Sequence, residues 1–283
     1  MQGALRCGTS GWAHGDWSGS VYPAIKPRGF HPLEYLSRHL DLVEIDTSFD
    51  APLRPELSKL WLRKVAERPG FVFTAIAGRQ FTFERQLDAT SIRAFKDGLW
   101  PLRQAGKLGC LLMRFPWSFR FTKENRDFLI ELRRIFHEFP LAAEMRHASW
   151  TLDEALGTLM DYRVGFCNID QPPGARATQP GSIITAPVGY VRLVGRNGAD
   201  WTGESAADYL YTPRELGLWQ DRIERIAVHT NATFVVAANH IGGKAAVNAM
   251  QLMAMLGEGS KPPRRRSPAV APIAPPELLL KAC

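Results

Sequence analysis

The sequence predicts an α/β fold, a (β/α)8 TIM-type barrel with a flexible Pro/Arg-rich C-terminal tail. Three observations predict it. The chain has 283 residues, about the length of one such barrel. Eight short apolar runs read as strands. Most of these runs are separated by stretches with helical periodicity, and strands that alternate with helices are typical of a parallel sheet.

The predicted strands cover residues 5–10, 42–47, 71–76, 108–114, 141–146, 164–169, 189–194 and 233–238. Helical patterns cover 31–40, 54–70, 84–107, 122–140, 151–163, 212–229 and 242–257. Thr122 and Thr151 are N-cap candidates. Residues 171–187 are rich in Pro and Gly and predict a loop. An open doubly wound sheet is the alternative fold, but it usually has fewer strands.

Composition divides the chain into a barrel domain, residues 1–257, and a disordered basic tail, residues 258–283. The net charge is +7, of which the tail carries +3, and this suits an anionic small molecule or nucleic acid as partner. None of the four cysteines is spaced as CxxC, so we expect a cytoplasmic protein with reduced thiols. No apolar run approaches a membrane span. The sequence does not indicate an oligomeric state.

Charged residues interrupt several of the predicted strands. Side chains alternate along a strand, and charges are not expected to face the helix layer of a barrel. We therefore expect them to line the lumen near its C-terminal mouth, where such barrels carry their active sites. The expected constellation comprises Glu44, Asp46, Glu144, Arg146, Asp170 and Arg192, with Arg114 and Asn239 as further candidates. The alternative is an internal ion-pair network that only closes the barrel.

Segments that follow the strands supply further candidates. Trp12, Trp17 and Trp150 fall there, and their flat rings suit sugars or nucleobases, although anchoring the core is an equal alternative. Gly242, Gly243 and Lys244 open the last helix, where backbone N–H groups attract phosphate. Arg192 and Arg196 are expected to converge there, but a Gly-Gly turn is also ordinary loop chemistry.

Cofactor signals are weak. His14, His147 and His240 lie at mouth positions and, with the nearby carboxylates, could hold a divalent metal. No HxH or HExxH spacing supports such a site, so we expect no metal. GxGxxG and GxSxG motifs are absent, which argues against a nicotinamide or flavin cofactor and against a serine hydrolase.

Six motifs occur in order: GTSGW…W.G..YP (8–23), LVEID.SF (42–49), KLGCLLMRFPWSF (107–119), AEMRHASW (143–150), YVRLVGR (190–196) and N…GGKAAVNA (239–249). Together they resemble the domain-of-unknown-function 72 family, also called YecE-like, over about residues 5–256. The resemblance implies the same barrel, and its likeness to endonuclease-IV-type barrels implies DNA binding. The chain departs from the family pattern at His14, Asp50, Arg114 and Val194, and its segment FTFER lacks the usual His.

The leading hypothesis is an enzyme-like site for a phosphorylated or nucleotide-type ligand, with hydrolysis as the reaction. Glu144 or Glu44 is the expected general base, with its pKa raised by burial. Arg146, Arg192 and Arg196 are predicted to bind the anionic group. Trp12, Trp17 and Trp150 are predicted to stack on the ligand ring. Catalytic roles are predicted for His147, as a proton shuttle, and for Asp170. Two alternatives are a non-catalytic nucleic-acid-binding barrel and a carbohydrate-active hydrolase with Glu44 and Glu144 as its two carboxylates.

Overall fold

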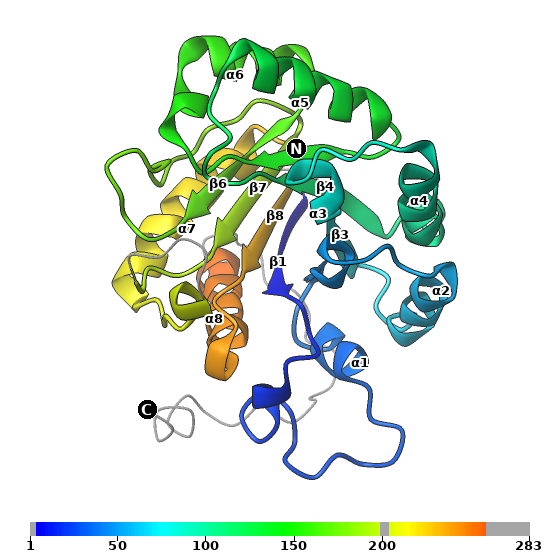
Figure 1. Ribbon diagram of the computed structural model, residues 1–283. Helices are drawn as coiled ribbons and strands as arrows, with labels where there is room; N and C mark the ends of the chain where they lie inside the picture. The colour runs from blue at the N-terminus through cyan, green and yellow to red at the C-terminus, as the bar shows by residue number, and fades with distance from the viewer. Residues whose placement is uncertain (1–3, 199–203, 259–283) are drawn as a thin grey trace.

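A computed structural model describes residues 4–198 and 204–258, and within them the chain forms a closed barrel of eight parallel strands (Figure 1). The strands follow one another around the barrel in chain order, and β1 pairs with β8 to close it. They are β1 Ala4–Ser10, β2 Leu42–Ile45, β3 Val72–Ile76, β4 Leu108–Arg114, β5 Leu141–Glu144, β6 Gly165–Asp170, β7 Val188–Leu193 and β8 Ala232–Ala237.

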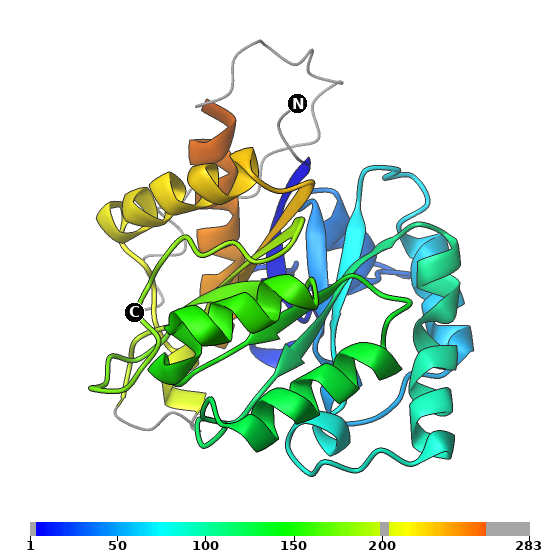
Figure 2. The same ribbon diagram turned by 90° about the horizontal axis from the view of Figure 1, so that it is seen from above.

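Helices lie outside the strands in both views (Figures 1 and 2). They are α1 Pro32–Ser37, α2 Pro55–Lys64, α3 Arg79–Thr82, α4 Ala89–Gln104, α5 Lys123–Ile135, α6 Asp153–Asp161, α7 Pro213–Val228 and α8 Lys244–Glu258. Short 3-10 turns follow several strand ends: η1 Gly15–Trp17, η2 Thr47–Phe49, η3 Ala148–Thr151, η4 Glu204–Ala207 and η5 Ile241–Gly243.

The barrel predicted from the sequence is confirmed, and each predicted strand end lies within two residues of the observed one. Residues 171–187 form the expected loop, so β6 leads to β7 without an intervening helix. The Thr122 side chain caps α5 by accepting the Asn125 N–H at 3.2 Å. Thr151 does not cap α6, because it is the last residue of η3 and Leu152 takes the cap position.

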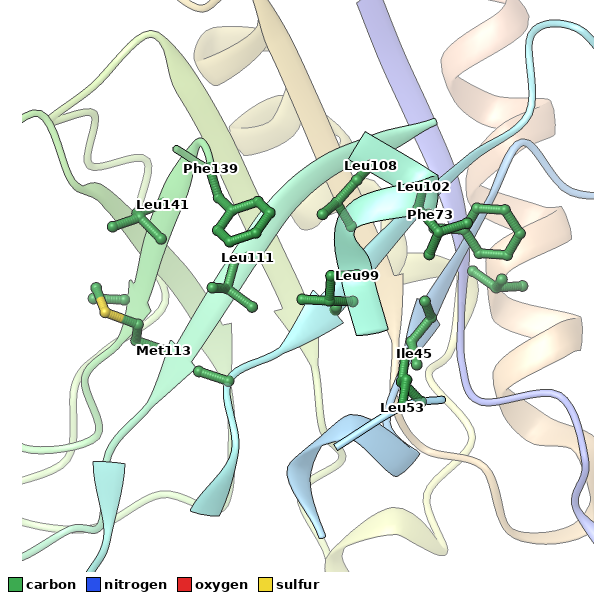
Figure 3. Packing of buried hydrophobic residues seen from close by; sticks show 14 of the residues in the cluster. Ile45, Leu53, Phe73, Leu99, Leu102, Leu108, Leu111, Met113, Phe139 and Leu141 are labelled. Atoms are coloured by element: carbon green, nitrogen blue, oxygen red, sulfur yellow. The ribbon is translucent and has the colours of Figure 1, made fainter. Parts of the chain in front are cut away.

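Two apolar layers hold the barrel. The outer layer packs strands β2 to β5 against the helices, and Figure 3 shows part of it, with Leu99 and Leu102 of α4 beside strand residues such as Phe73 and Leu111. The inner layer fills the lumen with residues that include Leu42, Cys110, Cys167, Tyr190 and Phe234. The lumen is therefore a packed interior, and only its C-terminal end is left for polar side chains.

The predicted basic tail, residues 258–283, lies outside the described residues except for Glu258, where α8 ends. Cys7, Cys110 and Cys167 are buried free thiols. Among the described helices, none has the length and hydropathy that a membrane crossing requires.

Candidate functional site at the barrel mouth

Strand alternation brings three charged residues into the lumen. Leu42, Ala142 and Tyr190 belong to the inner apolar layer. The residues two positions further along each strand are Glu44, Glu144 and Arg192, so they point the same way, one step nearer the mouth. Glu44 and Glu144 are 0% exposed and Arg192 is 4% exposed. These groups come from β2, β5 and β7 and meet inside the barrel.

One guanidinium joins the two carboxylates. Arg192 donates from Nε to Glu44 Oε1 at 3.1 Å and from Nη1 to Glu144 Oε2 at 3.1 Å, and its Nη2 forms an ion pair with Glu44 Oε1 at 3.0 Å. Tyr190 Oη donates to Glu44 Oε2 at 2.7 Å, and Ser10 Oγ donates to Glu44 Oε1 at 2.6 Å. Because both oxygens of Glu44 are occupied and its side chain is sealed from solvent, Glu44 has no free lone pair facing a substrate.

Two further arginines cover Glu144 on the mouth side. Arg146 donates from Nε and Nη2 to Glu144 Oε1 at 3.0 and 2.9 Å. Arg114 lies with its Nε 3.5 Å from the same oxygen and its guanidinium 4.9 Å from the centre of the Phe49 ring. Side-chain exposure rises from 5% at Arg192 to 10% at Arg146 and 23% at Arg114. Within residues 4–198 and 204–258, the cluster therefore holds three guanidiniums and two carboxylates, and its more exposed members are arginines.

Electrostatics fixes the protonation of this cluster. Burial raises the pKa of Glu144, but Arg146, Arg192 and Arg114 outweigh that effect and lower it to about 2. Burial lowers the pKa of Arg114 to about 10, and Glu144 opposes this change. Both groups remain charged at neutral pH. The predicted general base is therefore wrong for Glu144, because a carboxylate held ionised by three guanidiniums is a poor proton acceptor.

The carbohydrate alternative also loses its basis. It requires Glu44 and Glu144 to stand on either side of a glycosidic bond. Arg192 instead bridges the two carboxylates, and both are 0% exposed. No sugar can enter between them without breaking a buried ion-pair network.

Asp46 and His14 form a second polar group at the mouth. At Gly11, with φ +70°, an added Cβ would lie 2.4 Å from Asp46 Oδ2 and 2.7 Å from His14 Nε2, so only glycine lets these atoms converge. Burial raises the pKa of Asp46, and His14 opposes that rise. Burial lowers the pKa of His14, and its contact with the Ser10 carbonyl opposes the fall. The opposed shifts bring the pKa values of the acid and the base closer together.

A cavity of about 360 Å³ lies beside this pair. Asp46 forms part of its wall, together with Trp12, Arg54 and Trp61. The Trp12 and Trp61 rings meet edge to face at 4.9 Å, and Trp12 is 8% exposed. Trp12 therefore lines the cavity, and the stacking on a ligand ring predicted for it stays a prediction.

The stacking role predicted for Trp17 and Trp150 is wrong, because both rings are 0% exposed. Trp17 donates its indole N–H to the His240 carbonyl at 2.7 Å and lies against the ring of His14. Trp150 donates to the Phe119 carbonyl at 2.7 Å and stacks on the Phe119 ring. These tryptophans anchor mouth loops and present no face to a ligand.

Asp170 and Arg196 lie outside the lumen, contrary to prediction. Asp170 is the last residue of β6 and accepts the Trp219 indole N–H of α7 at 2.5 Å. Arg196 binds both Asp170 oxygens at 2.8 Å and also Glu215 at 2.8 Å. The backbone at Gly195 has φ +105°, which breaks the alternation that would have aligned Arg196 with Arg192. Asp170 faces the helix layer because these donors satisfy its charge.

The predicted phosphate site at the start of the last helix is occupied by the protein itself. The Gly242 N–H donates to Asp16 Oδ2 at 2.6 Å, and Lys244 pairs with Asp208. Gly243 is required for packing, since an added Cβ would lie 2.7 Å from Val21 Cγ2. Asn239 is 0% exposed and donates to the Tyr209 carbonyl at 2.7 Å and to Asn248 at 2.8 Å. Internal carboxylates thus take the place of a bound anion.

His147 lies at the edge of the mouth rather than in the lumen cluster. It is the N-cap of η3, and its Nδ1 accepts the Ser149 N–H at 3.1 Å. Within the described residues, no group of three or more His, Cys, Asp or Glu side chains is placed to hold a metal ion. The three histidines considered for a metal therefore do not form one site, although the rings of His14 and His240 stack at 4.6 Å.

Ser10 and Tyr190 belong to the cluster but were not predicted. Tyr190 lies two positions before Arg192 on β7, so the two side chains share a face and the inward direction of Tyr190 could be predicted from the sequence. Ser10 ends β1 level with Glu44 of β2, and this register becomes visible only when the strands pair. Neither side chain is charged, so neither interrupts an apolar run in the way that indicated the other residues of the cluster.

The model of the family described as "Protein of unknown function DUF72" matches residues 6–272. The chain belongs to this DUF72 family. The UPF0759 protein YunF of Bacillus subtilis is 26% identical over 273 residues, which cover 88% of this chain and 93% of that protein.

Solved structures of DUF72 proteins match the fold. That of a Thermotoga maritima member has a TM-score of 0.79 at 28% identity, covering 90% of this chain and 99% of that one. An Enterococcus faecalis member has a TM-score of 0.78 at 22% identity, covering 93% and 100%. The family resemblance expected from the sequence motifs is thereby confirmed. These similarities name no substrate.

Proposed function

We propose that this DUF72 barrel binds a phosphorylated or nucleotide-type ligand at its mouth, with the oxyanion on Arg114 and Arg146. The observation that carries the proposal is the buried Nε donor of Arg114. Its Nε is buried and has no hydrogen-bond partner among the described residues, since Glu144 Oε1 lies 3.5 Å away. A buried donor left unpaired costs about 1–3 kcal/mol, and a ligand oxygen would remove that cost.

The charge balance supports the same ligand. Among the described residues, three guanidiniums pack against two carboxylates in this cluster, and the more exposed arginines are those nearer the mouth. Arginine binds phosphate in a bidentate manner that lysine does not reproduce. The cavity beside Asp46, walled by Trp12 and Trp61, offers a place for the ring of the same ligand.

Hydrolysis remains the reaction that we propose, with different proton-transfer groups. Glu144 is held as an anion and Glu44 is sealed, so neither suits a base. Asp46 and His14 are partly exposed, Asp46 lines the cavity, and the pKa values of the two groups are shifted toward each other. We assign proton transfer to this pair.

Binding of phenyl phosphate and of inorganic phosphate, measured by isothermal titration calorimetry, tests the proposal. Arg114→Met should weaken both affinities at least about tenfold, because a hydrogen bond to a charged group contributes about 1.5–3 kcal/mol. Arg63→Met, on the exposed face of α2, is the matched control and should leave both unchanged. Equal affinity of Arg114→Met and the unmodified protein would refute the assignment.

A nucleic-acid backbone is the second candidate, favoured by the net charge of +7. It predicts that the affinity for a single-stranded oligonucleotide falls steeply with salt, in proportion to the number of phosphates neutralised. It also predicts weaker binding when residues 259–283 are removed. If the ligand is instead a compact anion bound by two or three arginines, its affinity should depend only weakly on salt and should not change when residues 259–283 are removed.

A further inference from the structure

His147 is held in one tautomer by its own turn. Its Nδ1 accepts the Ser149 N–H at 3.1 Å, and the Ser149 hydroxyl lies 2.9 Å from the same atom. That hydroxyl oxygen in turn accepts the Phe121 N–H at 2.8 Å, so its proton is directed to Nδ1. Since Nδ1 serves as an acceptor, the proton of the neutral ring lies on Nε2.

The Nε2–H donor has no acceptor. Nε2 is buried and lacks a hydrogen-bond partner among the described residues, and His147 as a whole is 8% exposed. An unpaired buried N–H is rare in proteins because its lost hydration is not replaced. This donor therefore points to an acceptor that residues 4–198 and 204–258 do not supply.

Two arginines lie near the turn that holds this donor. The Trp117 ring meets the His147 ring edge to face at 5.1 Å, and Arg120 lies 5.7 Å from the Trp117 ring centre. The Arg176 carbonyl accepts the Ala148 N–H at 2.8 Å, which places Arg176 beside the same turn. Both arginines are exposed, and neither forms an ion pair within the described part of the chain.

We infer that His147, Arg120 and Arg176 form an oxyanion subsite, separate from the Arg114–Arg146 site, that takes a phosphate group. The Nε2–H of His147 donates to one phosphate oxygen, and the two guanidiniums compensate the charge. Burial, Arg120 and Arg176 together lower the pKa of His147, so the ring donates as a neutral group. This role differs from the proton shuttle expected from the sequence, because Nδ1 is already committed.

The subsite goes beyond the proposed function and does not depend on it. Arg146 precedes His147 in the chain, so the two anion sites adjoin at the end of β5. The neighbouring arginines favour phosphate over a neutral acceptor.

Two substitutions of His147 distinguish the role of its Nε2–H as a donor from the role of its Nδ1 as the cap of η3. His147→Asn keeps an acceptor that can cap η3 in place of Nδ1 but removes the Nε2–H. His147→Gln places an amide N–H near the position of Nε2. Inorganic phosphate is titrated into each full-length protein and into the unmodified one, all in the Arg114→Met background, which removes the first site. Nitrogen-15 spectra of the imidazole follow the Nε2–H signal.

We expect the Nε2–H tautomer before titration and a shift of its signal on adding phosphate, but not on adding chloride at equal ionic strength. His147→Asn should weaken phosphate binding at least about tenfold at an unchanged melting temperature, and His147→Gln should restore part of it. A ring protonated on Nδ1, or equal phosphate affinity with His147→Asn, would overturn the subsite. If Arg114→Met left the phosphate affinity unchanged while phosphate still shifted the Nε2–H signal of His147, only the proposed function would be refuted.

Discussion

Glu144 shows how residue-scale charge pairing sets the character of the mouth. A carboxyl whose pKa falls from 4.5 to about 2 stabilises the folded state by about 3 kcal/mol at neutral pH. The same pairing removes Glu144 from consideration as a base. In the proposed function, stability and proton transfer therefore fall to different carboxylates, Glu144 in the lumen and Asp46 at the rim.

Replacement of Glu144 by Gln should lower the free energy of unfolding by about 3–5 kcal/mol, because it leaves three clustered guanidiniums without their shared anion. Urea denaturation at pH 7 measures it. Glu84→Gln is the control, since the Arg79–Glu84 pair at 3.4 Å is exposed and should contribute less than about 1 kcal/mol. Equal losses in the two variants would contradict the electrostatic account.

The contribution of Glu144 should depend on pH in one direction. Its folded-state pKa is depressed, so the stabilisation is fully present above the unfolded value of 4.5 and is lost as pH falls through about 2. The difference in unfolding free energy between the unmodified protein and Glu144→Gln should shrink across that window. Denaturation series at several pH values measure it, and a difference independent of pH would contradict the assignment.

Asp46 should show the opposite sign. Burial raises its folded-state pKa, so its ionisation costs stability as pH rises from 3.8 through the folded value. Asp46→Asn should therefore raise the melting temperature at pH 7, with the gain vanishing below pH 3.8, while it abolishes any hydrolysis that the pair supports. Calorimetric melting measures the first effect. A lower melting temperature at pH 7 would show that the carboxylate stabilises the mouth.

At the scale of elements, packing contacts decide what a glycine does. Gly98 lies inside α4, where an added Cβ would be 2.2 Å from the Leu53 carbonyl oxygen. Gly157 lies inside α6 with nothing within 4 Å of that position. The same substitution to Ala should thus have opposite effects at the two sites.

Gly98→Ala should destabilise by about 1–3 kcal/mol, because α4 must move away from the loop that carries Leu53. Gly157→Ala should stabilise by about 0.5–1 kcal/mol through helix propensity. Urea denaturation of both variants measures this. A stabilised Gly98→Ala would show that α4 is not held against that loop.

Element positions were predictable from the sequence because they depend on local periodicity. Strand alternation also placed Glu44, Glu144 and Arg192 correctly in the lumen. It failed at Asp170, whose partner Trp219 lies 49 residues away on α7. It failed again past Gly195, where one positive φ reverses the direction of Arg196. No local pattern encodes such long-range partners, and the buried tryptophans were misassigned for the same reason.

At the scale of the molecule, the lumen cluster ties strands that are not neighbours. Arg192 of β7 reaches Glu44 of β2 and Glu144 of β5. The cluster could therefore serve closure of the barrel alone, as the sequence-based alternative holds. Buried ion pairs are poor candidates for that task, since matched uncharged replacements are often as stable. This difference separates a structural network from a functional one.

The decisive comparison is between Arg192→Met and the triple variant Glu44→Gln, Glu144→Gln, Arg192→Met. The single variant leaves Glu44 without its guanidinium partner in a sealed lumen and should lose about 3–5 kcal/mol. The triple variant removes Arg192 together with both carboxylates but leaves Arg114 and Arg146 without their anion, so it should recover part of that loss. It should bind phenyl phosphate more tightly than the unmodified protein, because Glu144 no longer competes for these two guanidiniums. Urea denaturation and calorimetric titration measure the two quantities. A triple variant as unstable as the single one, with unchanged phosphate affinity, would show that the charges close the barrel and serve no ligand.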